Sequence, residues 1–447
     1  MPRVFLPPQR QMPFPRTGQP DKARGSAHSK SPLPHIICLA VVLPYSAALF
    51  IGDIKLTPIK ILLLLLTGPA IAKMLSGDRR QPRQLMASDL FALVTALLLL
   101  FMPLIVSGSK TLTSSVSQTL EFFGSYIIGR AYFFTNDSIR DLARALKVVT
   151  LFVVGMGLLD IITQHFLIHE FVASIFPVDE QIVVSSDPHF HRLILGMDSL
   201  RAASTFDHPI LFGSFCAILI PIHLYAHEDA TSRLFYALVS AVGCVIALSS
   251  APLLALAATI AIYCYDAMMR GARWRWKLLI FTILFGVAAL FVLSDNPLSW
   301  LFRNLTLDPQ TSYYRLLIWN AAIDQISNNF WLGVGTSPTG NAILDSSVDS
   351  LWLAKAIVYG VPMIVTLFLT GLAAVVPFRG QAKVRRSDPF LDRMSTAFSL
   401  MTTILFFISM TVYFWNAVWL FASLCIGIRV SLKERCLLAM RQHRHFK

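Results

Sequence analysis

Charged residues are scarce in this chain, and acidic ones are scarcer than basic ones. Only 14% of the 447 residues are Asp, Glu, Lys or Arg, whereas 55% are hydrophobic. This excludes an ordinary soluble domain, in which about a quarter of the residues carry charge. Apolar segments of about 20 residues, the length that crosses a hydrocarbon core, recur along the chain. We therefore expect one all-α membrane domain, a polytopic bundle of transmembrane helices.

Cysteine is rare as well, and the six cysteines form no disulfide framework and no metal-ligand spacing. All but one lie in predicted spans, and the last, Cys436, lies in a basic tail. The sequence therefore predicts no metal site and no cofactor.

The 25 acidic residues face 38 Lys and Arg, which leaves a net charge of +13. Nucleic-acid-binding proteins have a similar excess of basic residues, so the positions of these residues along the chain must distinguish nucleic-acid binding from a role in membrane topology. They collect before Pro34 and in "KMLSGDRRQPR", "RGARWRWK", "RGQAKVRR" and "RVSLKERCLLAMRQHRHFK". These stretches fall on one side if the helices alternate, which is the positive-inside pattern. The excess therefore sets membrane topology and argues against a nucleic-acid partner.

Apolar runs with polar ends predict about twelve spans, with both termini in the cytoplasm. The predicted spans lie near 34–51, 56–75, 88–106, 116–134, 147–168, 208–226, 234–249, 251–269, 278–294, 353–377, 394–410 and 412–428. Residues 1–33, rich in proline and basic residues, cannot bury a core and predict a disordered cytoplasmic tail. Residues 34–428 form the predicted membrane domain, and residues 429–447 a second basic cytoplasmic tail.

Because successive spans cross the membrane in alternating directions, two long segments, at about 169–207 and 295–350, are expected on the outer, periplasmic side. Loops of this length are usually functional or disordered. The second contains "YYRLLIWNAAIDQISNNF", whose apolar residues recur at the spacing of one helical stripe, at Leu316, Trp319, Ile323, Ile326 and Phe330. Because Arg315 and Asp324 lie off this stripe, the segment predicts an amphipathic helix against the membrane surface or the bundle.

The stretch "RAASTFDHP", residues 201–209, gathers charge directly before an apolar span. Pro209 suits the first turn of a helix and Asp207 or His208 can cap it, so free helix amides lie near Arg201. Guanidinium groups and helix amides both bind phosphate oxygens, which makes Arg201 and His208 candidate ligands of a diphosphate. The alternative is that Arg201 reaches to lipid headgroups and Asp207 only caps the helix.

Four further residues on the same predicted face are candidates. Arg315 and Tyr314 begin the amphipathic helix and are candidates for binding phosphate and sugar, although aromatic residues are also ordinary at membrane interfaces. Asp349 opens the next span and is a candidate general base or only a helix cap. Lys355, one or two turns deeper, needs a partner, a water-filled cavity or a function.

A secondary transporter of an acidic solute is the leading alternative from another class, and a flippase for lipid-linked sugars is the third. The transporter would use the intramembrane residues Glu121, Arg130, Asp160, Lys355 and Asp266. Glu121 and Arg130 are too far apart along one helix to pair directly, so each is expected to face the interior. The two long outer loops and the lack of an internal repeat argue against a transporter.

The order of these features resembles the O-antigen ligase and polysaccharide polymerase superfamily of bacterial inner membranes. The resemblance covers about residues 195–365 and is carried by "RAASTFDHP", "ALSSAPLLALA", "YYRLLIWNAAIDQISNNFWLGVGTS" and "VDSLWLAKAIVYGVP", in this order. It implies glycan transfer from undecaprenyl diphosphate to an acceptor hydroxyl on the periplasmic face, without metal or cofactor. By resemblance, Arg201 contacts the carrier diphosphate, Arg315 is the arginine of the long-loop helix, and Asp349 stands where ligases carry a histidine.

Two departures from the ligase pattern favour a polymerase. The second ligase arginine is absent from "LSSAPLL", where Ala251 follows Ser250, and Asp349 replaces the ligase histidine. We therefore expect a polymerase that joins undecaprenyl-diphosphate-linked oligosaccharides into exopolysaccharide or O-antigen, with an O-antigen ligase acting on lipid A core as the alternative. The implied partners are the lipid-linked donor, the growing polysaccharide acceptor, the lipid bilayer and, as a candidate, a chain-length co-polymerase.

The expected reaction is an inverting glycosyl transfer. Arg201 would stabilise the leaving diphosphate, helped by the helix start near His208. Asp349 would accept the proton of the acceptor hydroxyl, with Asp207 as the substitute.

Overall fold

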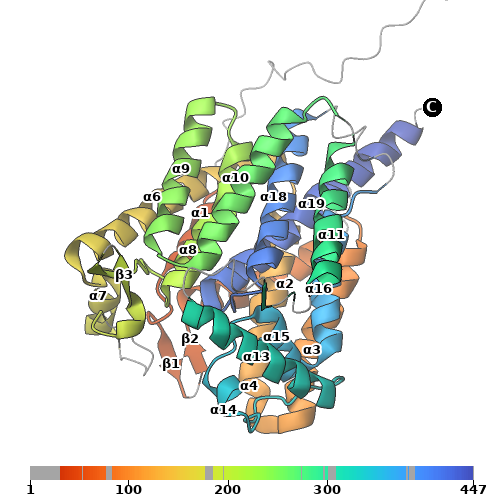
Figure 1. The fold of residues 1–447 in the computed structure, drawn as a ribbon. Helices are drawn as coiled ribbons and strands as arrows, with labels where there is room; N and C mark the ends of the chain where they lie inside the picture. The colour runs from red at the N-terminus through yellow and green to blue at the C-terminus, as the bar shows by residue number, and fades with distance from the viewer. Residues whose placement is uncertain are drawn as a thin grey trace, which may run out of the picture.

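The computed structural model describes residues 31–445 except 53, 77–82, 177–184, 195, 273, 295–296, 298, 301–308, 379–380 and 382–387. The described residues are mainly helical (Figure 1). The α-helices are α1 (Leu33–Val42), α2 (Pro58–Leu75), α3 (Ala87–Ser107), α4 (Leu112–Thr119), α5 (Ser125–Tyr132), α6 (Asn136–Thr163), α7 (Leu167–Ile175), α8 (Pro209–Ala226), α9 (Ala230–Ile246), α10 (Ser250–Met268), α11 (Arg275–Leu293), α13 (Pro309–Asn328), α14 (Ala342–Ser346), α15 (Leu351–Tyr359), α16 (Val361–Val375), α18 (Pro389–Ile408) and α19 (Asn416–His445). The predicted segment 1–33 lies almost wholly outside the described residues.

Within the described part of the chain, eight helices are long and apolar enough to cross a membrane, namely α2, α3, α6, α8, α10, α11, α18 and α19. The helices α1, α9 and α16 are apolar but shorter. The chain is thus a polytopic helical membrane protein. Each of the twelve predicted spans coincides with a helix or a pair of helices, but four of them lack a single helix of the required length.

Two of these four predicted spans are cut short by proline or glycine. The first ends at Val42, because Pro44 cannot continue the helix, and a small antiparallel hairpin of β1 (Leu49–Ile51) and β2 (Ile54–Leu56) follows. The predicted span 353–377 is divided into α15 and α16 at Gly360, whose φ of +80° no helix accepts.

The segment predicted to span 116–134 is divided differently. Here α4 and α5 are joined by a π-helical turn over Leu120–Gly124. Such turns insert an extra residue into the helical ladder and are frequent at functional sites. Glu121 lies in this turn and its side chain is buried. The helical backbone continues through this turn from Leu112 to Tyr132, although no single α-helix covers the segment.

The core is built around α8, which packs against α9, α10 and α18. Almost every residue of α8 is buried, as expected for a helix that is apolar on all sides. By contrast, α11 buries no residue against the rest of the described chain. The membrane helices therefore range from a fully enclosed centre to a helix with apolar side chains exposed all round.

Both predicted outer segments lie away from the C-terminus. In Figure 1 the hairpin β1–β2, α4, α13 and α14 gather at the lower end of the bundle, with α7 and β3 at the lower left, whereas the C-terminus lies at the top. Besides α7, the first outer segment contains an antiparallel hairpin of β3 (His191–Ile194) and β4 (Met197–Leu200). We call this lower end, formed by β1–β2, α7, β3–β4, α13 and α14, the loop end.

The amphipathic helix in the second outer segment is α13, but its buried face differs from the predicted stripe. The side chains of Ile318 and Ala322 are buried against Leu344, Leu353 and Ile357 of α14 and α15. Two members of the predicted stripe, Ile323 and Phe330, are instead about half exposed, at 47% and 45%. The prediction was also wrong to place Arg315 off the buried face, because only 7% of this residue is exposed.

The end of α13 is fastened to the break between α15 and α16. The amide of Val334 donates to the carbonyl of Ile357 at 2.8 Å, and the amide of Val361 donates to the carbonyl of Phe330 at 2.8 Å. Gly333 and Gly360 both have positive φ at this crossing, and each would bring a Cβ atom against the opposite backbone. The two backbone segments therefore cross so closely that neither glycine has room for a side chain.

The segment predicted as a C-terminal tail, 429–447, continues α19 to His445. The helix persists because its first turns are buried and paired. The guanidinium of Arg429 donates from Nε to Ser399 Oγ at 2.7 Å, and Glu434 accepts from Arg130 Nη1 at 2.6 Å. Arg130 also pairs with Asp89 at 2.7 Å, so this charged network holds α3, α5 and α19 together.

Candidate functional site

Arg201 is held at the end of the β3–β4 hairpin, just before α8. Its amide donates to the carbonyl of Phe190 at 2.8 Å, and its guanidinium donates from Nη1 to the carbonyl of His189 at 3.2 Å. Only 5% of the residue is exposed. Among the described residues its side chain donates only to carbonyl groups, so the buried guanidinium has no opposite charge there. Arg201 is therefore buried in the protein, and the alternative that it extends to lipid headgroups does not describe this conformation.

A second arginine, Arg192 of β3, acts electrostatically on both predicted phosphate ligands. Burial and then the positive charge of Arg192 lower the pKa of Arg201 to about 10. The pKa of Arg315 is also lowered, by burial first; the carboxylate of Asp349 opposes this shift and Arg192 adds to it. The charge of Arg192 thus acts on both arginines predicted from separate segments, and we call Arg192, Arg201 and Arg315 the arginine cluster.

Asp349 faces the arginine cluster from the start of α15. Its Oδ2 lies 3.8 Å from Arg315 Nε, a nitrogen with no hydrogen-bond partner among the described residues. The Asp349 side chain is 41% exposed and accepts a hydrogen bond from Ser347 Oγ at 3.2 Å. The N-cap of α15 is Ser350 rather than Asp349. The Asp349 carboxylate therefore does not cap the helix, and it remains accessible to solvent beside Arg315.

Tyr314 stands next to Arg315 on α13 and points toward α14. Its hydroxyl lies 2.8 Å from Ser346 Oγ, and 41% of the residue is exposed. This arrangement leaves the ring at the surface of the loop end, and its contact with a sugar stays a prediction.

His208, and not Asp207, caps the start of α8. His208 Nδ1 accepts a hydrogen bond from the amide of Ile210 at 3.1 Å. Burial, followed by the charges of Arg201 and His189, lowers the pKa of His208 to about 3, so the ring is neutral at pH 7. Its ring also lies 6.2 Å from that of Trp415. The residue is thus a neutral cap between Arg201 and α19, without the positive charge that a phosphate ligand would use.

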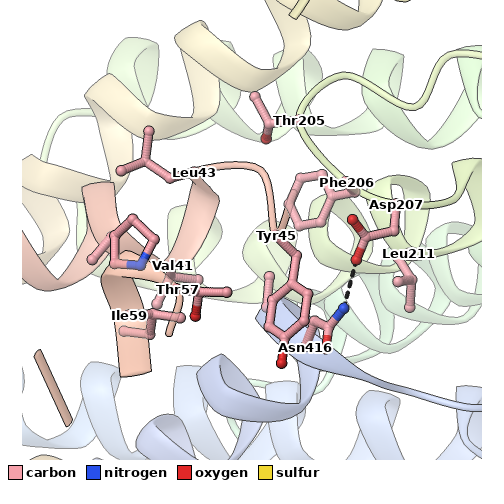
Figure 2. Close-up of a pocket in the computed structure, with 13 residues that line it drawn as sticks. Val41, Leu43, Tyr45, Thr57, Ile59, Thr205, Phe206, Asp207, Leu211 and Asn416 are labelled. Atoms are coloured by element: carbon pink, nitrogen blue, oxygen red, sulfur yellow. Dashed lines mark hydrogen bonds between the residues drawn. The ribbon is translucent and has the colours of Figure 1, made fainter. Parts of the chain in front are cut away.

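Asp207 lines a small hollow, shown in Figure 2, together with Tyr45 and Asn416. Asn416 Nδ2 donates to Asp207 Oδ2 at 2.6 Å. Burial raises the pKa of Asp207, while the hydrogen bond from Asn416 and the charge of Lys55 oppose the shift. A carboxylate with a raised pKa is a better proton acceptor when ionised, which suits the predicted role.

A group of charged and aromatic residues that the sequence did not single out as a unit lies beside this hollow. Lys60 pairs with Glu121 of the π-turn at 3.2 Å, and the Lys60 ammonium is 5.1 Å from the centroid of the Tyr45 ring. Burial and then the charges of Glu121 and Asp207 raise the pKa of Tyr45. Tyr45 therefore connects Asp207 electrostatically to the buried pair of Lys60 and Glu121.

Lys355 finds its partner on α4. Its Nζ donates to Gln118 Oε1 at 2.8 Å, and the ammonium lies 5.1, 5.7 and 5.2 Å from the ring centroids of Tyr359, Tyr413 and Trp419. Such cation–π contacts stabilise a buried ammonium. Lys355 is thus satisfied inside the protein, so a direct contact with phosphate is not needed to explain it.

The structure does not bring the remaining intramembrane charges together into one path. Arg130 belongs to the network of Asp89 and Glu434, and Asp266 pairs with Arg275 at 2.8 Å. Asp160 contacts only backbone amides of the segment after Arg201 among the hydrogen bonds of the described residues. Each charge thus has its own local partner.

Residues 235–368 match the O-antigen ligase family. The match begins in α9 and ends in α16, so the matched region includes Arg315, Asp349 and Lys355, while Arg201 precedes it. The resemblance predicted from the sequence is confirmed, and members of this family are glycan-transferring enzymes. No curated protein matches the chain.

Proposed function

We propose that this protein is a polymerase that joins undecaprenyl-diphosphate-linked oligosaccharide units into exopolysaccharide or O-antigen. The arginine cluster supports the proposal, because Arg192, Arg201 and Arg315 bring positive charge to the loop end, where Asp349 lies 3.8 Å from Arg315. A diphosphate matches such a site, since each guanidinium group can form a bidentate contact with two phosphate oxygens. The O-antigen ligase domain supports the same class of donor.

In the proposed reaction, the terminal hydroxyl oxygen of the acceptor attacks the anomeric carbon of the donor sugar. The bond from that carbon to the diphosphate breaks, and the diphosphate leaves with the bonding electrons. Arg201, Arg192 and Arg315 stabilise the charge that develops on it. The hydroxyl proton passes to Asp349, or to Asp207 as the second candidate, and the configuration at the anomeric carbon is inverted.

The proposal includes the orientation of the chain in the bacterial inner membrane. Twelve helical segments, including the four shorter ones, cross the membrane with both termini in the cytoplasm. The loop end then faces the periplasm, where the lipid-linked units are polymerised. The clusters of Lys and Arg near the ends of α2, α10, α16 and α19 support this orientation by the positive-inside rule.

A polymerase is preferred to a ligase for two reasons found in the chain. Position 251, just inside α10, is alanine where the ligase pattern has its second arginine, and Asp349 replaces the ligase histidine. A ligase that attaches glycan to lipid A core is the alternative. Loss of attachment with unchanged polymer length in a deletion strain would identify a ligase.

The test uses a deletion strain complemented with the wild-type protein or with Arg201→Ala, Arg315→Ala or Asp349→Asn. Polymer is measured on gels at equal protein level, and Arg140→Gln, 48% exposed on α6, serves as the control. We expect single units on the carrier at the periplasmic face without the protein, and polymer only with wild type and control. Full polymer synthesis by both Arg201→Ala and Asp349→Asn would disprove these roles, and units held at the cytoplasmic face would indicate a flippase.

A further inference from the structure

We propose that Asp160 of α6 is a positioning residue for Arg201. The inference rests on the proposed role of Arg201 in binding the donor diphosphate. The hydrogen bonds that Asp160 accepts come from backbone amides after Arg201. Its carboxylate holds the short backbone turn that follows Arg201 and leads to Asp207 and α8.

The contacts of Asp160 are all made by one oxygen atom. Asp160 Oδ2 accepts a hydrogen bond from the amide of Ser204 at 2.7 Å and another from the amide of Ala203 at 3.2 Å. The two bonds therefore connect α6 to the turn at the residues two and three positions after Arg201.

The backbone of this turn has the shape that favours an anion. Ser204 has a φ of +56°, in the left-handed region that few residues other than glycine adopt. Successive amides around such a residue point into one concavity that binds negative groups. The chain fills this concavity with its own carboxylate, which stabilises a conformation that serine would otherwise avoid.

Burial of the Asp160 side chain costs free energy, which argues for a functional role of this residue. Its side chain is fully buried, and among the described residues it takes part in no ion pair. Its second oxygen, Oδ1, has no hydrogen-bond partner there. Burying a carboxylate without a counter-charge is expensive, so an intramembrane aspartate of this kind indicates a function.

The other contacts of the turn point to the same purpose. Ser204 Oγ donates to the carbonyl of Val153 on α6 at 2.7 Å, and the amide of Ala202 donates to the carbonyl of Ile246 at 3.1 Å. The Phe206 carbonyl lies 3.1 Å from Nε2 of His169 on α7. The turn is thus fixed from three helices, and Asp160 supplies its two central bonds. Displacement of a substrate-binding group by about 1 Å can reduce a rate about 100-fold.

The test measures kcat and KM in membrane vesicles, with lipid-linked units isolated from the deletion strain as substrate. We expect Asp160→Ala to lower kcat about 100-fold at equal protein level, with little change in KM. Asp160→Asn, whose amide oxygen still accepts both bonds, is expected to restore most of the activity. Asp137→Ala, a change at a 53% exposed position of the same helix, is the control.

A double-variant cycle separates positioning from a general structural role. In the Arg201→Lys background, which keeps the positive charge but loses the planar guanidinium, Asp160→Ala should cost less than about threefold, because Asp160 acts through Arg201. Costs that multiply in the double variant would overturn the proposal, and so would full kcat in Asp160→Ala. If Asp160→Ala fails to accumulate, Asp160→Glu replaces it. The longer side chain shifts the turn, so full kcat in Asp160→Glu would also overturn the proposal.

The outcomes distinguish this inference from the proposed function. Full activity of Arg201→Ala would reject the role of Arg201 and with it the proposed function. An inactive Arg201→Ala together with fully active Asp160 variants would leave the proposed function intact and reject only the positioning role.

Discussion

Asn416 donates a hydrogen bond to Asp207 across 2.6 Å and joins the first residue of α19 to the segment before α8. Asn416 has a φ of +49°, in the left-handed region that asparagine tolerates better than most residues. Strained backbone of this kind is often found at functional sites. The position therefore needs both the backbone freedom and the amide of asparagine, and these two needs can be tested separately.

Asn416→Gly keeps the left-handed backbone but removes the donor to Asp207. A hydrogen bond to a charged group contributes about 1.5–3 kcal/mol, so we expect polymer synthesis per protein to fall about tenfold or more at normal abundance. Asn416→Val should in addition lower stability by about 1–3 kcal/mol, because a β-branched residue resists positive φ. Gel analysis of polymer and thermal unfolding in detergent measure the two effects. Wild-type synthesis by Asn416→Gly would show that this bond is dispensable.

The pH dependence of the reaction identifies the base. If Asp207 is the base instead of Asp349, kcat should fall as the pH decreases through the pKa of Asp207, which burial raises, because a base acts only when ionised. Asn416→Gly removes a bond to the ionised form and should move the fall to higher pH. Asp207→Asn should then abolish the fall of kcat at low pH. A pH–rate profile that is unchanged in Asp207→Asn would assign the proton transfer to Asp349.

Arg192 is expected to contribute to donor binding although the sequence did not single it out. Arg192→Gln removes one charge from the arginine cluster and should raise the KM for the lipid-linked donor about tenfold at low salt. The effect should shrink as salt increases, since screening weakens the contribution of exposed charges. Kinetics in vesicles at two ionic strengths measure both effects, with Arg140→Gln as the matched loss of charge. An equal rise of KM in both variants would contradict a local role.

The pair of Lys60 and Glu121 should stabilise the fold around the π-turn. Glu121→Gln leaves the Lys60 ammonium, which is 11% exposed, without its opposite charge, and we expect a loss of about 3–5 kcal/mol in the free energy of unfolding. The double variant Lys60→Met/Glu121→Leu should recover much of this loss, because neither buried charge remains. Unfolding in detergent measures both. As a reference, removal of the exposed pair Asp137–Arg140 should change stability by less than about 1 kcal/mol.

The helices could be predicted from the sequence because membrane spans depend on the length of apolar runs. Their interruptions were harder to place. The end of α1 and the break at Gly360 depend on single proline and glycine residues inside apolar runs. The buried face of α13 was misplaced because Arg315 was counted as a surface residue, whereas the structure buries it opposite Asp349.

The candidate site was predictable only where one short stretch carried the chemistry. Arg201, Arg315 and Asp349 stood out because each opens or precedes an apolar segment. Arg192 and Asn416 did not, since their importance comes from neighbours far away in the sequence. The same holds for Asp160, which the sequence offered as part of a transport path and which instead binds backbone amides.

The crossing of Gly333 and Gly360 sets a limit on how this protein can diversify. A Cβ atom at Gly333 would meet the carbonyl of Ile357, and one at Gly360 would meet the carbonyl of Trp331. Substitution at either glycine would separate α13 from α15, and with them Arg315 from Asp349. Related proteins can therefore vary the exposed surface of α13 to suit different sugars, while these two glycines, which touch no substrate, should change as rarely as the arginines.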